Sequence, residues 1–110
     1  LEVWDPELAQ PRNILPPPMN VPMIPDLPNW AWHEYGMRVG FWRLLNTLKK
    51  RNICSTLALN ATVIDHYPET VEAAMNEQWE PLGHGYIQRP MHKVDNEFVD
   101  IKSAIEKINK

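Results

Sequence analysis

A chain of 110 residues is long enough for one small domain and too short for most multi-layer enzymes. The net charge of −3 gives no electrostatic reason to expect nucleic acid or an anionic membrane as a partner. No run of residues is apolar for long enough to span a membrane, and no signal peptide is recognisable, so we expect a cytoplasmic protein. The single cysteine, Cys54, has apolar neighbours that predict a buried, inert thiol.

The N-terminal quarter of the chain is dominated by proline. Residues 1–4 alternate apolar and polar side chains and predict a strand that ends near Asp5. Most of the 11 prolines follow, so residues 6–28 predict an extended arm in polyproline conformation. Because the arm also carries many apolar side chains, we expect it to lie against another surface, either of this chain or of a partner.

Helices and strands alternate after the arm. Apolar side chains at three- and four-residue steps predict an amphipathic helix over about 35–51. The further elements expected are a strand over 55–59, a helical turn over 61–66, a helix from Pro68, a strand over 79–83 and a helix N-capped by Asp95. The apolar faces expected to be buried are Met37, Phe41, Leu44, Leu45 and Leu48, then Val71, Ala74 and Met75, then Phe98, Ile101, Ile105 and Ile108. This order predicts an α/β fold with parallel strands.

Candidate functional residues gather where the expected strands end, because parallel strands place their carboxyl ends at one rim. Glu2 and Asp5 belong to the first strand end, Asn60 to the second and His84 to the third. Glycines on both sides of His84 permit a positive φ and the close approach of a ligand, although they are also typical of a tight turn capped by the histidine. We expect the first and third strands to lie side by side and to bring Glu2 and His84 together.

Three segments together resemble a known family: the run His33-Glu34-Tyr35-Gly36-Met37-Arg38-Val39-Gly40-Phe41-Trp42-Arg43-Leu44-Leu45, then Tyr67-Pro68-Glu69, then Gly83-His84-Gly85-Tyr86-Ile87-Gln88-Arg89-Pro90-Met91-His92-Lys93. They are similar to the polysaccharide deacetylase (NodB-homology) superfamily, and more narrowly to its branch of metal-independent, allantoinase-like amide hydrolases. The resemblance implies a distorted (β/α) barrel, of which residues 1–110 would form the N-terminal part. It also implies hydrolysis of an amide C–N bond, commonly with zinc held by an aspartate after the first strand and a His-x-x-x-His pair after the third.

The ligand set that the resemblance implies is only partly present. His84 matches the first histidine of the pair, but Gln88, a poor zinc ligand, stands at the position of the second. Glu2 matches the acidic position loosely, and His92 is a replacement ligand if its turn folds back. Zinc-dependent and metal-free hydrolysis therefore both stay open.

Either mechanism must activate a water and stabilise a tetrahedral oxyanion. Glu2 and His84 are the candidate catalytic residues, with an exposed strand-end carboxylate as the alternative for Glu2. The candidate substrate-binding residues are His33, Glu34, Trp32, Gln88 and Arg89. Their structural alternatives are an early-turn carboxylate for Glu34, an anchor for the arm for Trp32 and an ion pair for Arg89.

The arm and the aromatic segment after it would narrow a cleft, which favours a small or cyclic amide over a polysaccharide chain as substrate. Three strands cannot close a barrel, so we expect the missing strands from another chain or a continuation of this one, in a homo- or hetero-oligomer. The alternative function is a non-catalytic subunit or interaction module whose arm wraps a partner chain.

Overall fold

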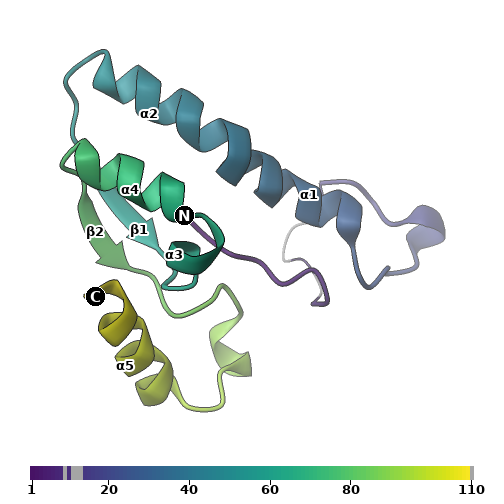
Figure 1. The fold of residues 1–110 in the computed structure, drawn as a ribbon. Coiled ribbons are helices and arrows are strands. Elements are labelled where there is room, and N and C mark those ends of the chain that lie inside the picture. The colour runs from purple at the N-terminus through teal and green to yellow at the C-terminus, as the bar shows by residue number, and fades with distance from the viewer. Residues whose placement is uncertain (9, 11–13, 110) are drawn as a thin grey trace.

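The sheet consists of two parallel strands, β1 (Thr56–Leu59) and β2 (Glu80–Gly83) (Figure 1). The computed structural model describes residues 1–8, 10 and 14–109. The first residues run as an extended segment along the other edge of β1, where the Leu1 amino group donates to the Ala58 carbonyl and the Asn60 N–H donates to the Leu1 carbonyl at 3.0 Å. The mixed helix and strand content and the parallel pairing confirm the expected α/β class.

The order of the extended segments differs from the expected one. β1 lies between the first segment and β2, so the expectation that the first and third strands lie side by side is wrong. The two chain segments meet only beyond the strand ends, where Trp4 and Gln88 form an isolated parallel bridge and the Gln88 N–H donates to the Val3 carbonyl at 3.2 Å. The shared rim nevertheless exists, because all three segments point the same way.

One long helical rod follows the arm, and it begins earlier than the expected 35–51. It comprises α1 (Leu27–Tyr35), a π-helical turn (Gly36–Gly40) and α2 (Phe41–Lys49). Asp26 caps its start by accepting the Asn29 N–H at 3.3 Å, and Pro28 sits in the first turn, where the missing N–H costs nothing. The arm therefore ends at Asp26 rather than at Pro28.

The remaining helices follow the expected order. They are α3 (Val63–His66), α4 (Pro68–Asn76) and α5 (Glu97–Ile108), with short 3-10 turns at Pro18–Asn20 and Met91–Lys93. Asn96, rather than the expected Asp95, caps α5 by accepting the Val99 N–H at 3.2 Å. Asp95 and Asn96 are both suitable N-cap residues, so the sequence alone could not decide between them and the tertiary structure does.

The core lies between the rod, β1 and α4. Its buried apolar residues are Val3, Met37, Phe41, Leu45, Leu57, Leu59, Val63, Tyr67, Ala74 and Trp79. Several residues expected inside are exposed instead: Leu44 and Met75, together with Phe98, Ile101 and Ile105 of α5. Cys54 is exposed as well, so the expectation of a buried thiol is wrong. Periodicity identifies the apolar face of a helix but cannot say what covers it.

The described part of the arm forms a loop closed at its neck by Asn29. This buried side chain accepts the Leu15 N–H and donates to the Leu15 carbonyl, both at 2.9 Å. The apolar side chains beyond the neck, among them Met19 and Ile24, are exposed. Positions 9 and 11–13 of the predicted arm lie outside the described residues. Across the described ranges, no helix combines the length and apolar character needed to cross a membrane.

Candidate functional site

The turn Gly83-His84-Gly85 follows β2 and is held by the residues that follow β1. Gly85 has a φ of +79°, which a residue with a side chain rarely adopts, whereas Gly83 continues the strand. The Ala61 N–H donates to the Gly85 carbonyl at 3.0 Å, and the buried Asn60 side chain donates to the His84 carbonyl. These bonds fix the backbone of His84 while leaving its side chain 49% exposed.

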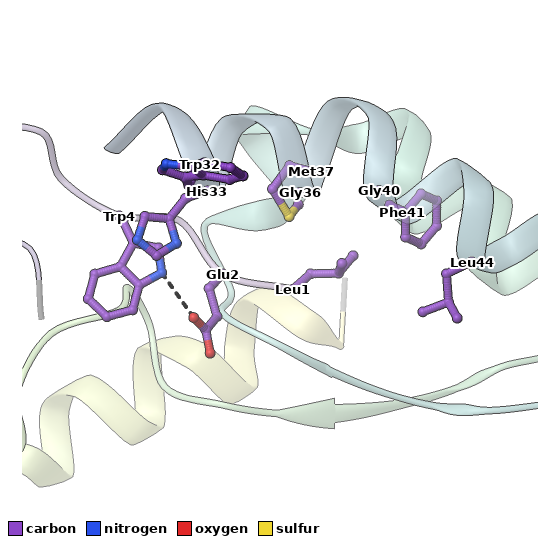
Figure 2. A pocket seen from close by; sticks show the side chains of 10 residues that line it. All are labelled: Leu1, Glu2, Trp4, Trp32, His33, Gly36, Met37, Gly40, Phe41 and Leu44. Carbon is purple, nitrogen blue, oxygen red and sulfur yellow. Dashed lines mark hydrogen bonds between the residues drawn. The ribbon is translucent and has the colours of Figure 1, made fainter. Parts of the chain in front are cut away.

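His84 meets Glu2 at the shared rim. The Nε2 atom of His84 lies 3.5 Å from Oε1 of Glu2, and the two side chains are 49% and 40% exposed. The other carboxylate oxygen accepts the Trp4 indole N–H at 2.9 Å (Figure 2). The structure thus brings the two expected catalytic residues together, and Trp4 holds the carboxylate in place.

An aromatic pair stands beside Glu2. The rings of Trp4 and His33 stack with their centroids 4.8 Å apart and an interplanar angle of 22°. The Trp30 indole N–H donates to the Trp4 carbonyl at 3.0 Å and so ties the first segment to α1. Burial lowers the pKa of His33, and the nearby Glu2 carboxylate offsets part of this effect. The lowered pKa favours the neutral form of His33, in which one ring nitrogen can donate a hydrogen bond and the other can accept one.

The depressed pKa of His33 predicts a pH dependence of stability. Because the folded state binds this proton less readily than the unfolded state, unfolded chains take up protons first as the pH falls. The contribution of neutral His33 to stability is present above the ordinary histidine pKa of 6.5 and is lost as the pH falls through the folded value. An NMR titration of the His33 ring should give a pKa below 6.5 that rises in a Trp4→Ala variant. An unchanged pKa in that variant would mean that stacking does not bury the ring.

Glu2 and His84 each line a cleft of their own. One, of about 420 Å³, is lined mainly by apolar side chains of the rod, with Glu2, Trp4, Trp32 and His33 at one end (Figure 2). The other, of about 320 Å³, is lined by His84, Gln88 and Arg89. A molecule in the first cleft would therefore meet Glu2, and a molecule in the second would meet His84.

Glu34 lies in a structural network rather than in these clefts. It accepts a hydrogen bond from the Tyr67 hydroxyl and pairs with Arg38 at 2.7 Å. Burial, together with the bond to Glu34, raises the pKa of Tyr67 to about 12. Glu34 is in the last turn of α1, so the early-turn alternative is also wrong. Glu34 is not among the residues that line either cleft.

Gln88 and Arg89 line the cleft beside His84 but also have structural partners. The Gln88 side-chain oxygen accepts from Asn60 Nδ2 at 3.2 Å. Arg89 pairs with Asp100 at 3.0 Å, and the same carboxylate accepts the Tyr86 N–H at 3.1 Å. Arg89 therefore fits the ion-pair alternative, whereas Gln88 lines the cleft with a neutral side chain that is hydrogen-bonded to Asn60.

The expected zinc ligands do not assemble. His92 is exposed in the turn Met91–Lys93, and the part of the chain that the structure describes contains no cluster of three His, Cys, Asp or Glu side chains that could hold a metal ion. The structure therefore does not bring Glu2, His84 and His92 together as one group among the described residues. Glu2 is already bonded to Trp4, and Gln88, which stands where the resemblance would place a second histidine, is a poor zinc ligand.

Two residues of the site, Trp4 and Asn60, were not assigned a role in it from the sequence. Trp4 follows Glu2 by two residues, and on an extended segment this spacing puts both side chains on one face. Asn60 was placed at the rim without a role, although it is fully buried and hydrogen-bonded to Val3, His84 and Gln88. Strand periodicity could have indicated Trp4, but the burial of Asn60 depends on contacts between distant segments.

Comparison with protein-family models, with curated proteins and with solved structures gives no match to this chain. The resemblance to the deacetylase superfamily therefore stays a prediction that depends on the quoted residues.

Proposed function

We propose that this chain contributes the catalytic rim of a hydrolase that acts on a non-peptide amide C–N bond. The contact between Glu2 and His84 at the common end of parallel segments, open to two clefts, is the observation that supports it. An acid and an imidazole at this separation form a common pairing for activating water. The small clefts favour a small or cyclic amide over a polysaccharide.

The chemistry can be written with residues of this chain. Glu2, held by Trp4, orients His84, and the imidazole takes a proton from water as the oxygen attacks the amide carbon. The tetrahedral oxyanion then collapses, the C–N bond breaks and the imidazolium returns the proton to the leaving nitrogen. Gln88 is a suitable donor to the oxyanion, since its side-chain oxygen faces Asn60 and its NH₂ group can face the cleft. No step here passes through a metal.

We also propose that this chain forms part of a larger barrel. Every residue of β2 is exposed, and so is the apolar face of α5 that carries Phe98, Ile101 and Ile105. Open strand edges and apolar helix faces of this kind are normally covered. We propose that further strands, from another chain or a continuation of this one, complete a deacetylase-like (β/α) barrel in a cytoplasmic oligomer.

A second candidate function is supported by the arm. Its described apolar side chains are exposed and its neck is closed by Asn29, so the loop is a preformed docking element for a partner chain. In this alternative the protein is a non-catalytic subunit and the rim performs no chemistry.

An assay with the full-length protein as purified separates the two candidates. A panel of small linear and cyclic amides should release amine or ammonia, with turnover that survives prolonged dialysis against a chelator if the reaction is metal-free. If chelation abolishes turnover and added zinc restores it, the remaining zinc ligands come from outside residues 1–110. No hydrolysis of any amide, with or without zinc, would contradict the proposed function and favour the interaction module.

A further inference from the structure

Asn60 is a fully buried polar residue at the end of β1. Its side chain is 0% exposed, although amides are normally found at the surface. Buried amides persist where their donors and acceptors are satisfied, and Asn60 meets this condition with three partners. These three hydrogen bonds therefore offset the cost of burying the amide.

The two ends of the Asn60 amide hold the two halves of the candidate site. Its Oδ1 atom accepts the Val3 N–H at 3.2 Å, next to Glu2 in the chain. Its Nδ2 atom donates to the His84 carbonyl and, at 3.2 Å, to the Gln88 side-chain oxygen. One planar group thus joins the segment that carries the carboxylate to the turn that carries the imidazole.

We propose that Asn60 is the positioning residue that sets the separation between Glu2 and His84. It touches neither side chain directly and acts through the backbone on both sides of the pair. A group with an acceptor at one end and a donor at the other is needed, which an asparagine of this length supplies and aspartate, serine or alanine does not. The effect on rate rests on the proposed amide hydrolysis, whereas the effect on geometry does not.

The test is Asn60→Asp, with Asn76→Asp as the matched control because Asn76 is exposed on α4. Aspartate keeps the acceptor for the Val3 N–H but sets a carboxylate oxygen against the His84 carbonyl, so only the histidine turn is pushed away. In NMR spectra we expect the contact between the His84 ring and the Glu2 side chain to disappear while the Val3 amide stays protected from exchange. We expect kcat to fall on the order of 10- to 100-fold with KM within about twofold, because misplacement acts on the reacting geometry.

The NMR contact and the kinetic constants test two different claims, the positioning role of Asn60 and the proposed amide hydrolysis. If the wild-type protein hydrolyses no amide, the proposed function fails and the NMR contact alone decides the role of Asn60. An Asn60→Asp variant that keeps both the contact and the wild-type kcat would overturn the positioning role. If that variant does not fold, the wild-type protein still provides a test: the Asn60 side-chain amide protons should be protected and close to His84, and exposure of these protons to exchange would overturn the inference.

Discussion

Replacing His84 by alanine is expected to lower kcat for amide hydrolysis on the order of 10³-fold, since it removes the group that moves the proton. The fold should survive, because the side chain of His84 is half exposed and its turn is held by backbone bonds. Steady-state kinetics and a thermal melt measure the two effects. His66→Ala is the matched control, because that ring is exposed and hydrogen-bonded to Thr62 within its own short helix. Wild-type kcat in the His84 variant would remove this residue from the mechanism.

Replacing Leu59 by alanine is expected to cost about 3 kcal/mol of the free energy of unfolding, within the range for large-to-small changes in cores. Leu59 is 1% exposed on β1, between the first segment and β2, so a cavity there cannot collapse easily. A loss of this size is a large share of the stability of a small domain. Urea denaturation measures this loss of free energy, provided that the m-value (the slope of the free energy of unfolding against urea concentration) is the same in both proteins.

Leu44→Ala is the matched control for this change. Leu44 is 54% exposed on α2, and the same truncation there should cost less than about 1 kcal/mol. If both variants lost the same free energy, Leu59 would not lie at the centre of the core.

The elements that could be predicted from the sequence are those fixed by local patterns. β1, β2 and the start of α4 at Pro68 follow from strand periodicity and from the preference of proline for a first helical turn. The start of α1 could not be predicted, because the run of prolines indicated an extended chain as far as Pro28. The helix in fact begins directly after its cap, Asp26. The position of β1 between the other two extended segments depends on contacts between distant residues, which periodicity does not encode.

The two central residues of the site could be predicted from the sequence, but most of their partners could not. Parallel strands share a rim, so Glu2 and His84 could be assigned to one end without knowing the order of the strands. The partners of Glu34 and the burial of Asn60 arise only when distant segments pack together. Glu2 and His84 meet at the rim, but sequence spacing alone could not show whether the turn of His92 also folds back toward it.

A double-mutant cycle on turnover tests most directly whether Glu2 and His84 work as one unit. Glu2→Gln, His84→Ala and the double variant would be compared with the wild-type protein in the same amide assay. The account predicts that the double variant loses about as much kcat as His84→Ala alone, because an orienting carboxylate has no role once its imidazole is gone. Losses that multiply, as for two independent groups, would contradict a joint role for the pair.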